Sequence, residues 1–184
     1  MKLFELYDQN SHPKALIIGG HHGDEPIGVD ICKKLAELTP ANDGLRIITM
    51  ANRPAYIAKT REFNGIDLNR AYGKEKTNMP ELDDMISTIK QLASESAVVV
   101  DCHSTPLEGL QEISVFPNKC GQKIAPYMQL PHYVHEAPEN SLRFFCDEIN
   151  VPAITFEGIT ELHNESVEAG VAGILSLLNK LKII

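Results

Sequence analysis

Short apolar runs alternate with longer segments of helical periodicity along this chain. The predicted strands lie at residues 15–18, 45–50, 97–100, 112–116 and 151–156. The predicted helices carry apolar residues mostly at three- and four-residue steps, over residues 26–38, 80–94, 141–149 and 164–182. This alternation predicts an α/β layer fold whose sheet is mostly parallel.

Two segments show little apolar periodicity. Residues 52–79 hold Arg, Asn, Gly and Pro, and we expect a long irregular stretch there. Residues 117–138 contain four prolines, and we expect mostly loop with one short helix. Long loops in compact domains often carry function, so both segments are candidates for lining a site.

The composition is that of a folded, acidic domain. The chain has 184 residues, of which 43% are apolar and 23% charged, so one domain over residues 1–184 is expected. Its 17 Lys and Arg against 25 Asp and Glu give a formal charge of −8, which argues against a general nucleic-acid or anionic-membrane binder. No apolar stretch reaches the roughly 20 residues that a membrane span needs.

Cysteine usage and the first residues indicate a reducing compartment. The four cysteines are widely spaced and form no CxxC pair. Glu5 and Asp8 stand where a signal peptide would have its apolar core. We therefore expect a cytoplasmic protein with reduced thiols.

Three predicted strands lead into polar residues that can carry chemistry. In chain order these residues are His21, His22, Glu25, Asp101, His103 and Glu157. In open α/β sheets, ligands bind in the crevice beyond the carboxyl ends of the strands. The sequence therefore predicts a functional site that collects side chains from distant parts of the chain.

Two imidazoles and one carboxylate in this group suit a catalytic zinc ion. His22 and Glu25 sit three residues apart at a strand-to-helix turn, and His103 is the candidate third ligand. This set is a usual three-ligand arrangement of a catalytic zinc, whose fourth position is left to water. A phosphate loop is the alternative for the neighbouring glycines, but neither a G-x-G-x-x-G nor a G-x-x-x-x-G-K-[ST] pattern is present there.

These residues belong to four motifs that resemble a known family. The motifs are Gly-Gly-His-His-Gly-Asp-Glu (19–25), Asn-Gly-Ile-Asp-Leu-Asn-Arg (64–70), Asp-Cys-His (101–103) and Thr-Phe-Glu (155–157). In type and order they resemble the zinc carboxypeptidase superfamily, and they are most similar to its succinylglutamate desuccinylase/aspartoacylase branch. The resemblance implies a three-layer α/β/α fold with a mixed, mostly parallel sheet and one Zn²⁺ per chain.

The resemblance also implies a role for each matching residue. By position, the resemblance implies that the zinc ligands are His22, Glu25 and His103. It implies that Glu157 is the catalytic glutamate and that Asn69 and Arg70 hold the substrate carboxylate. It also implies that Asp67 orients the first histidine ligand. Arg53 looks like the arginine that polarises the scissile carbonyl, with Arg61 as its rival.

Elementary chemistry agrees with these roles. A glutamate beside the metal can take a proton from water and return it to the leaving amine. An arginine can pair with an oxyanion as it forms, and the planar fork of Arg70 can grip a carboxylate with two hydrogen bonds. Asp67 can fix the tautomer of His22 through its second ring nitrogen.

Two neighbours of the ligands are interpreted as lying outside the metal set. His21 is expected to be a pocket wall or surface group, because adjacent side chains rarely converge on one ion. Asp101 is expected to be an orienting or structural acid rather than a ligand. The cysteines are most simply interpreted as buried small residues.

The end of the chain departs from the family pattern. Only 26 residues follow Gly158, and they read as one helix. The sequence therefore predicts a single catalytic domain without the C-terminal β-rich domain of aspartoacylase-type members. The Pro-rich stretch 104–140 is expected to wall the pocket instead. Its neighbourhood supplies five candidate polar contacts, Ser104, Thr105, Tyr127, Tyr133 and Arg143.

The sequence thus predicts a zinc-dependent hydrolase that cleaves an amide bond in a small carboxylate-bearing substrate, such as an N-acyl-amino acid. A metallocarboxypeptidase or a murein-peptide amidase, which cuts next to a diaminopimelate, would use the same machinery. A non-catalytic zinc-binding domain is the third alternative, although a structural zinc is usually closed by four protein ligands. No nucleic-acid or membrane partner is expected, and the sequence carries no signal for an oligomeric state.

Overall fold

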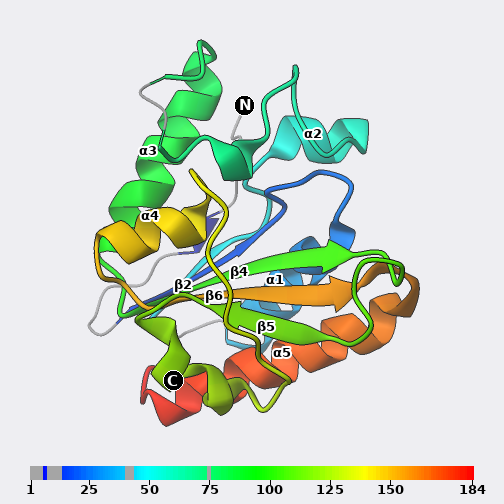
Figure 1. Ribbon diagram of the computed structural model, residues 1–184, viewed down its shortest axis with the longest axis vertical. Helices are drawn as coiled ribbons and strands as arrows, with labels where there is room; N and C mark the ends of the chain where they lie inside the picture. The colour runs from blue at the N-terminus through cyan, green and yellow to red at the C-terminus, as the bar shows by residue number, and fades with distance from the viewer. Residues whose placement is uncertain (1–5, 8–13, 40–43, 74–75) are drawn as a thin grey trace.

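One mixed sheet runs through the described part of the chain. The computed structural model describes residues 6–7, 14–39, 44–73 and 76–184 (Figure 1). Within these residues the sheet has six strands in the order β1-β3-β2-β4-β6-β5. The strands are β1 (Leu6–Tyr7), β2 (Ala15–Gly19), β3 (Leu45–Ile48), β4 (Val98–Thr105), β5 (Ser114–Pro117) and β6 (Ala153–Ile159). The four inner strands are parallel and the two edge strands antiparallel, which confirms the mixed, mostly parallel sheet.

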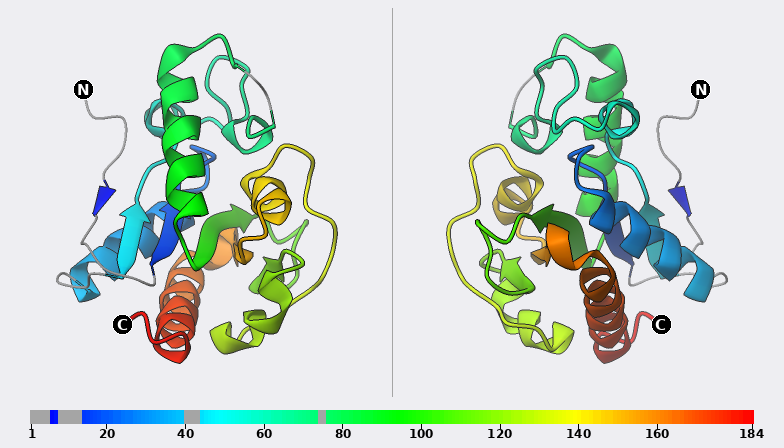
Figure 2. Two further views of the ribbon diagram at one scale, coloured as in Figure 1. Left: turned by 90° about the vertical axis from the view of Figure 1, so that its left-hand side faces the viewer. Right: turned by 90° about the vertical axis from the view of Figure 1, so that its right-hand side faces the viewer.

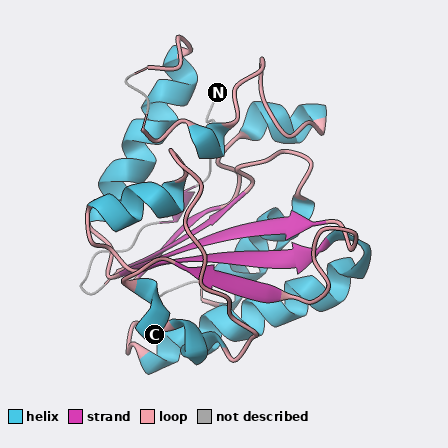
Figure 3. Cartoon of the chain, in the orientation of Figure 1, coloured by secondary structure: helices cyan, strands magenta, loops and turns pink. Residues whose placement is uncertain are grey.

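Helices cover both faces of this sheet (Figures 2 and 3). The longer helices are α1 (Pro26–Leu38), α3 (Pro80–Ser94), α4 (Leu142–Glu148) and α5 (His163–Lys180). Apolar side chains of α1 and α5 share one core with one face of the sheet, and those of α3 and α4 share a second core with the other face. The predicted three-layer α/β/α fold is therefore confirmed.

The two cores follow from the alternation of side chains along the strands. In β4, Val100 and Cys102 belong to the core under α1 and α5, whereas Val99 belongs to the core under α3 and α4. Since successive side chains point to opposite faces, Asp101 and His103 share the face of Val99. The pleat thus places both polar side chains on one face of the sheet, among the elements that carry the other motifs.

Helix α1 approaches the sheet closely because small residues lie at the contact. A Cβ atom added at Gly28 would lie 2.1 Å from the carbonyl oxygen of Cys102 in β4. A Cβ atom at Gly19, the last residue of β2, would lie 2.3 Å from the carbonyl oxygen of Gly28. Pro26 stands in the first turn of the helix, where its missing N–H costs no hydrogen bond. The helix therefore starts directly over the end of β2, which fixes the position of Glu25.

The prediction of an irregular stretch over residues 52–79 was wrong in part. The structure contains the short helix α2 (Arg53–Ala58) and the single 3₁₀ turn η1 (Leu68–Arg70). The side chain of Asn52 accepts a hydrogen bond from the N–H of Ala55 and so caps α2. Only Ala55 of this helix is buried, so the segment shows no apolar periodicity in the sequence.

The remaining connections contain short 3₁₀ turns. They are η2 (Gly121–Lys123), η3 (Ala125–Met128) and η4 (Thr160–Leu162), the first two lying in the segment expected to be mostly loop. No helix among the described residues is long and apolar enough to cross a membrane. Glu5 and Asp8, the acids weighed against a signal peptide, lie outside the described residues.

Candidate active site

The polar motifs meet along the neighbouring strands β4 and β6 of the sheet. The sequence suggested that His103 and Glu157 follow the ends of their strands, but both lie within them, in β4 and β6. They are direct partners in the parallel ladder between these strands. The pairing of β2 with β4 ends at Gly19 and Cys102, whereas β4 and β6 stay paired as far as Thr105 and Ile159. The loop 20–25 follows β2 at the point where this strand ends.

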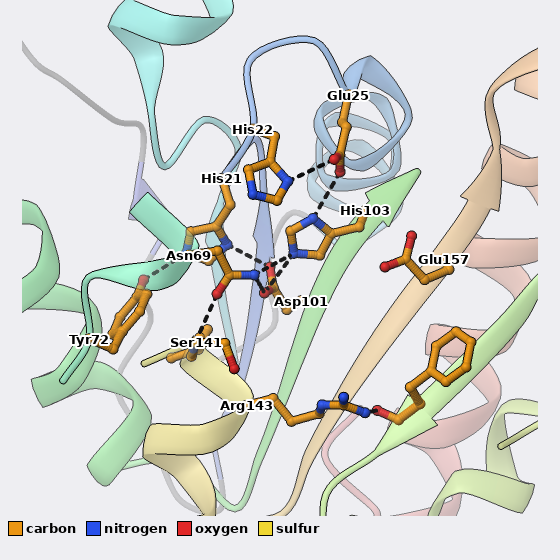
Figure 4. Close-up of polar contacts among 12 residues, drawn as sticks. His21, His22, Glu25, Asn69, Tyr72, Asp101, His103, Ser141, Arg143 and Glu157 are labelled. Atoms are coloured by element: carbon orange, nitrogen blue, oxygen red, sulfur yellow. Dashed lines mark hydrogen bonds and ion pairs between the residues drawn. The ribbon is translucent and has the colours of Figure 1, made fainter. Parts of the chain in front are cut away.

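His22, Glu25 and His103 converge as the sequence predicts (Figure 4). The Nδ1 atom of His22 lies 2.7 Å from Oε1 of Glu25, and the Nδ1 atom of His103 lies 2.8 Å from Oε2 of the same carboxylate. One ligand atom from each residue lies within 4.8 Å of the others. All three residues are at most 8% exposed. Two nitrogens and a carboxylate in this compact arrangement fit the donor set of a zinc ion.

The second nitrogen of each imidazole is held by another carboxylate. Nε2 of His22 lies 3.1 Å from Oδ1 of Asp67, and Nε2 of His103 lies 2.8 Å from Oδ2 of Asp101. A proton held on Nε2 by these acids leaves Nδ1 as the ligand atom when a metal binds. Both Nδ1 atoms face Glu25, so the tautomers suit one shared ion.

The charges in this cluster reinforce one another. Burial alone would raise the pKa of Glu25, but the charge and hydrogen bond of His103, together with those of His22, hold that pKa well below its ordinary range. Burial alone would lower the pKa of His103, but Asp101 and Glu25 raise it well above its usual value. Without a metal, the acids therefore stay ionised and the imidazoles tend to keep both protons.

Asn69 and Arg70 lie beside this cluster at the turn η1. The side-chain amide of Asn69 donates to Oδ2 of Asp101 over 3.3 Å, and its carbonyl accepts from the N–H of Leu142 at the start of α4. The guanidinium of Arg70 donates to the backbone carbonyl of Asn69 and lines the same pocket. Asn69 thus ties the start of α4 to Asp101, and Arg70 presents its charge to the pocket.

Glu157 stands apart from the hydrogen-bonded ligands, on the side of His103 away from His21 (Figure 4). Its carboxylate accepts a hydrogen bond from the hydroxyl of Thr105 over 3.0 Å. Burial raises the pKa of Glu157 above its ordinary value, although the neighbouring charge of His103 opposes this. A carboxyl group with a raised pKa beside a ligand set can exchange protons with a bound molecule.

A pocket of about 230 Å³ opens over these residues. Its wall combines ligand, acid and guanidinium groups with parts of the Pro-rich stretch, and includes His22, Glu25, Arg61, Asn69, Arg70, His103, Thr105, Phe116, His135, Pro138, Arg143 and Glu157. Thr105 and Arg143 are the two candidate polar contacts that line it. Ser104, Tyr127 and Tyr133 do not line it; the last two are 37% and 48% exposed.

The structure brings Arg61, rather than Arg53, to the pocket. Arg61 donates to Glu25 and to Asp67, each over 3.3 Å. Arg53 lies in the first turn of α2, partly buried, and is not among the residues that line the pocket. The sequence-based preference for Arg53 is therefore not supported by the pocket lining, in which Arg61 takes part and Arg53 does not.

His21 was interpreted wrongly as a pocket wall or surface group. It is fully buried and does not line the pocket. Its Nδ1 atom lies 2.7 Å from Oδ1 of Asp101, and its Nε2 atom lies 2.6 Å from the hydroxyl of Tyr72. Asp101 thus bridges His21 and His103, in keeping with an orienting acid. Tyr72 was not identified from the sequence, where its only signal is its closeness to the Asn69-Arg70 motif.

Arg143 is a buried cation at the far wall of the pocket. It is 5% exposed, and burial lowers its pKa. Its guanidinium contacts two backbone carbonyls, those of Phe116 and Glu136, and the ring of His135, whereas its Nε atom has no hydrogen-bond partner. The described residues place no carboxylate in an ion pair with this arginine, so its charge is left to polar backbone groups and to the pocket.

The three-layer α/β/α fold is shared with solved structures of an aspartoacylase family protein and of the cell shape determinant Csd4. The model of the succinylglutamate desuccinylase/aspartoacylase catalytic domain matches residues 11–181. The chain belongs to this family, as its motifs predicted. Deacetylase and carboxypeptidase activities, which are named for its relatives, both break amide bonds.

Three relatives illustrate the range of the likeness. The N-alpha-acetyl-L-2,4-diaminobutyric acid deacetylase of Halomonas elongata is 35% identical over 99 residues, which are 50% of this chain and 28% of the deacetylase. An aspartoacylase family protein of Mesorhizobium loti is 21% identical with a TM-score of 0.76, over 96% of this chain and 60% of that one. The cell shape determinant Csd4 of Helicobacter pylori, described as a D,L-carboxypeptidase and solved with a bound tripeptide, is 16% identical with a TM-score of 0.75, over 98% of this chain and 56% of Csd4. The chain therefore spans less than two thirds of each relative.

Proposed function

We propose that this domain is a zinc-dependent hydrolase that cleaves the amide bond of a small carboxylate-bearing substrate, of the N-acyl-amino acid type. The observation that carries the proposal is the convergence of His22, Glu25 and His103 next to an acid, Glu157, that is not tied into the ligand set. A structural metal site needs no such acid and is usually closed by four protein ligands. Convergence of three donors with a separate acid therefore favours a catalytic site over a purely structural one.

One zinc ion per chain would be held by His22, Glu25 and His103. It would supply a Lewis acid that activates water near neutral pH and polarises the scissile carbonyl. Asp67 and Asp101 keep the ligand imidazoles oriented through their Nε2 atoms.

Free, buried thiols at Cys32, Cys102 and Cys146 agree with a reducing compartment such as the cytoplasm.

Glu157 moves the proton in this reaction. As water adds to the carbonyl carbon, the Glu157 carboxylate takes one proton from it. The protonated acid then gives that proton to the amide nitrogen while the carbon–nitrogen bond breaks. Water is consumed, and a carboxylic acid and an amine are formed. Burial raises the pKa of Glu157, which makes its carboxylate a stronger base for taking the proton from water.

The guanidinium groups position the substrate and its developing charge. Arg61 lies at the mouth of the ligand cluster, and we assign it the pairing with the oxyanion that the sequence had given to Arg53. Arg70, with Asn69, offers a planar fork to the substrate carboxylate. Arg143 adds a second cation at the opposite wall, which suits a further anionic or polar group on the substrate.

The carboxypeptidase or murein-peptide amidase alternative uses the same groups. The likeness to Csd4 favours it, whereas the higher identity to the deacetylase and the family match favour an N-acyl-amino acid. Hydrolysis of N-acetyl- and N-succinyl-amino acids, measured against tripeptides and diaminopimelate-containing peptides, separates the two. We expect release of the amino acid from an N-acyl substrate, loss of turnover with a chelator and recovery with Zn²⁺.

Glu157→Gln tests the proton transfer. The amide keeps the shape of the side chain but cannot take the proton, so we expect kcat to fall at least 100-fold while one zinc per chain is retained. Glu148→Gln, at an exposed position of α4, is the matched control and should keep full activity. Unchanged turnover in Glu157→Gln on a substrate that the wild type cleaves would contradict the assigned role.

A further inference from the structure

A chain of buried hydrogen bonds runs from the metal ligand His103 back into the core under α3 (Figure 4). Asp101 accepts from His103 through Oδ2 over 2.8 Å and meets His21 through Oδ1 over 2.7 Å. His21 in turn meets the hydroxyl of Tyr72 over 2.6 Å. The side chains of these four residues are at most 4% exposed, and His21 and Tyr72 take no part in lining the pocket.

The proton assignments along this chain follow from its acceptors. Asp101 as a carboxylate can only accept, so Nε2 of His103 and Nδ1 of His21 both donate to it. With a proton on Nδ1, His21 has Nε2 as its acceptor atom, and the hydroxyl of Tyr72 is the donor that reaches it. Nδ1 of His103 is left as the atom that faces Glu25, while the side-chain nitrogen of Asn69 approaches Nε2 of His103 over 3.1 Å.

The geometry also gives Asp101 a fixed orientation. Its Oδ2 atom receives a second bond, from the amide of Asn69, while Oδ1 has His21 as its side-chain partner. The rings of His21 and His103 stack at 5.8 Å with an angle of 8° between their planes. Removal of His21 would therefore free one oxygen of Asp101 to turn and would remove a ring that packs flat against the ligand.

We propose that His21 and Tyr72 are positioning residues that set the zinc affinity of the site through Asp101 and His103. They hold the Asp101 carboxylate where it keeps the remaining proton of His103 on Nε2, so that Nδ1 is ready for the metal. The inference rests on the proposed zinc site and assigns a role to two residues beyond the ligands and their direct partners. Partners of metal-bound histidines are known to affect affinity in this way.

Three variants of the whole chain test the proposal. His21→Leu removes the bond to Asp101, and we expect the zinc dissociation constant to rise about tenfold. His21→Asn keeps a donor near the position of Nδ1, so it should stay within about threefold of the wild type. Tyr72→Phe removes only the hydroxyl that holds the tautomer of His21, and we expect a smaller rise of about threefold. The affinity is measured by competition with a chromogenic chelator.

A control separates metal affinity from general loss of stability. Ile89→Val shortens a fully buried side chain in the same core as Tyr72, so it should lower the melting temperature of the metal-free protein without changing the zinc dissociation constant. A ¹⁵N–¹H correlation spectrum of the imidazoles adds a direct readout, because His21 should carry its proton on Nδ1 in the wild type and lose this preference in Tyr72→Phe.

The outcomes are distinguishable. A wild-type chain that binds no zinc would overturn the metal site and this inference together. If the wild type binds zinc, equal affinity in His21→Leu, or equal weakening by His21→Leu and His21→Asn, would overturn the positioning role alone. If His21→Leu does not fold, Tyr72→Phe decides, and an unchanged affinity with an unchanged His21 tautomer would overturn the proposal.

Discussion

Carboxylates and imidazoles alternate through the site, and each of the two buried acids joins two rings. Glu25 lies between His22 and His103, and Asp101 lies between His103 and His21. A buried charge is costly unless it is paired and hydrogen-bonded, and here each charge has partners of opposite sign. The arrangement therefore stays ionised in a buried setting and offers two nitrogens and a carboxylate to one cation.

At this scale the arginines give the sharpest prediction. In Arg61→Ala the pocket loses the guanidinium beside Glu25, and we expect kcat to fall about 100-fold with zinc stoichiometry unchanged. Arg53→Ala is the matched control and should leave kcat within about twofold. Steady-state kinetics on an N-acyl-amino acid check both variants, and a large loss in Arg53→Ala with none in Arg61→Ala would restore the assignment made from sequence.

Site residues that lie close together in the sequence could be predicted. Those whose position depends on the path of the chain between distant segments could not. His22 and Glu25 are three residues apart, and His103 closely follows a clear apolar run, so their types and positions sufficed. Which of the two arginines, Arg53 or Arg61, reaches the pocket depends on the path of the chain around α2. The residue pattern does not predict that path. His21 finds its partners Asp101 and Tyr72 at separations of 80 and 51 residues, and its burial depends on both.

At the scale of elements, the close contact between α1 and the sheet positions the first two of the three proposed ligands. His22 and Glu25 lie in the short turn between β2 and α1, so any shift of the helix shifts the carboxylate. Gly28 permits the approach, since a Cβ atom there would meet the carbonyl oxygen of Cys102 at 2.1 Å. The backbone of β4 cannot yield in the way that a flexible side chain can.

We therefore expect Gly28→Ala to destabilise the protein. Alanine favours a helix by about 1 kcal/mol relative to glycine, but overpacking against a strand costs about 1–3 kcal/mol and displaces the helix. The free energy of unfolding, measured with urea, should fall, and zinc affinity should fall with it. Glu37→Ala at an exposed position of the same helix should stay within about 0.5 kcal/mol of the wild type. A Gly28→Ala variant as stable as the wild type would show that α1 can move without cost.

Most long elements could be predicted from periodicity, whereas their ends and the short elements could not. Strands β4 and β6 extend past the apolar runs from which they were predicted, because they pair with each other through His103 and Glu157. The helix α2 was missed because one buried residue in six gives no period. Absence of a C-terminal β-rich domain stays a prediction, as does the single domain over residues 1–184.

At the scale of the whole molecule, the charged cluster links folding to pH and to the metal. Hydrogen bonds to Asp67 and Glu25 outweigh the opposing effect of burial and raise the pKa of His22, and the pKa of His103 is raised as well. A histidine whose pKa is higher in the folded state stabilises the fold below its unfolded pKa and loses this as pH rises through the folded value. For Glu25 the folded pKa is lowered, so its contribution is lost as pH falls through the acidic range.

The metal-free protein should therefore be most stable between about pH 4.5 and pH 6.5 and should lose stability as pH rises further. Zinc should reverse this trend, because binding displaces protons from the imidazoles and is favoured at high pH. Urea unfolding at pH 6 and pH 8.5, with chelator and with excess Zn²⁺, tests both halves. Stability of the metal-free protein that increases over this interval would contradict the proton assignment.

The central claim is that one zinc ion binds where His22, Glu25 and His103 converge. The most direct measurement is a crystal structure of the zinc-loaded protein with anomalous data collected at the zinc absorption edge. The account predicts one peak per chain, with both Nδ1 atoms and a Glu25 oxygen at about 2.0–2.2 Å from it. A peak bound by other side chains, or no peak at this site in fully zinc-loaded crystals, would contradict it.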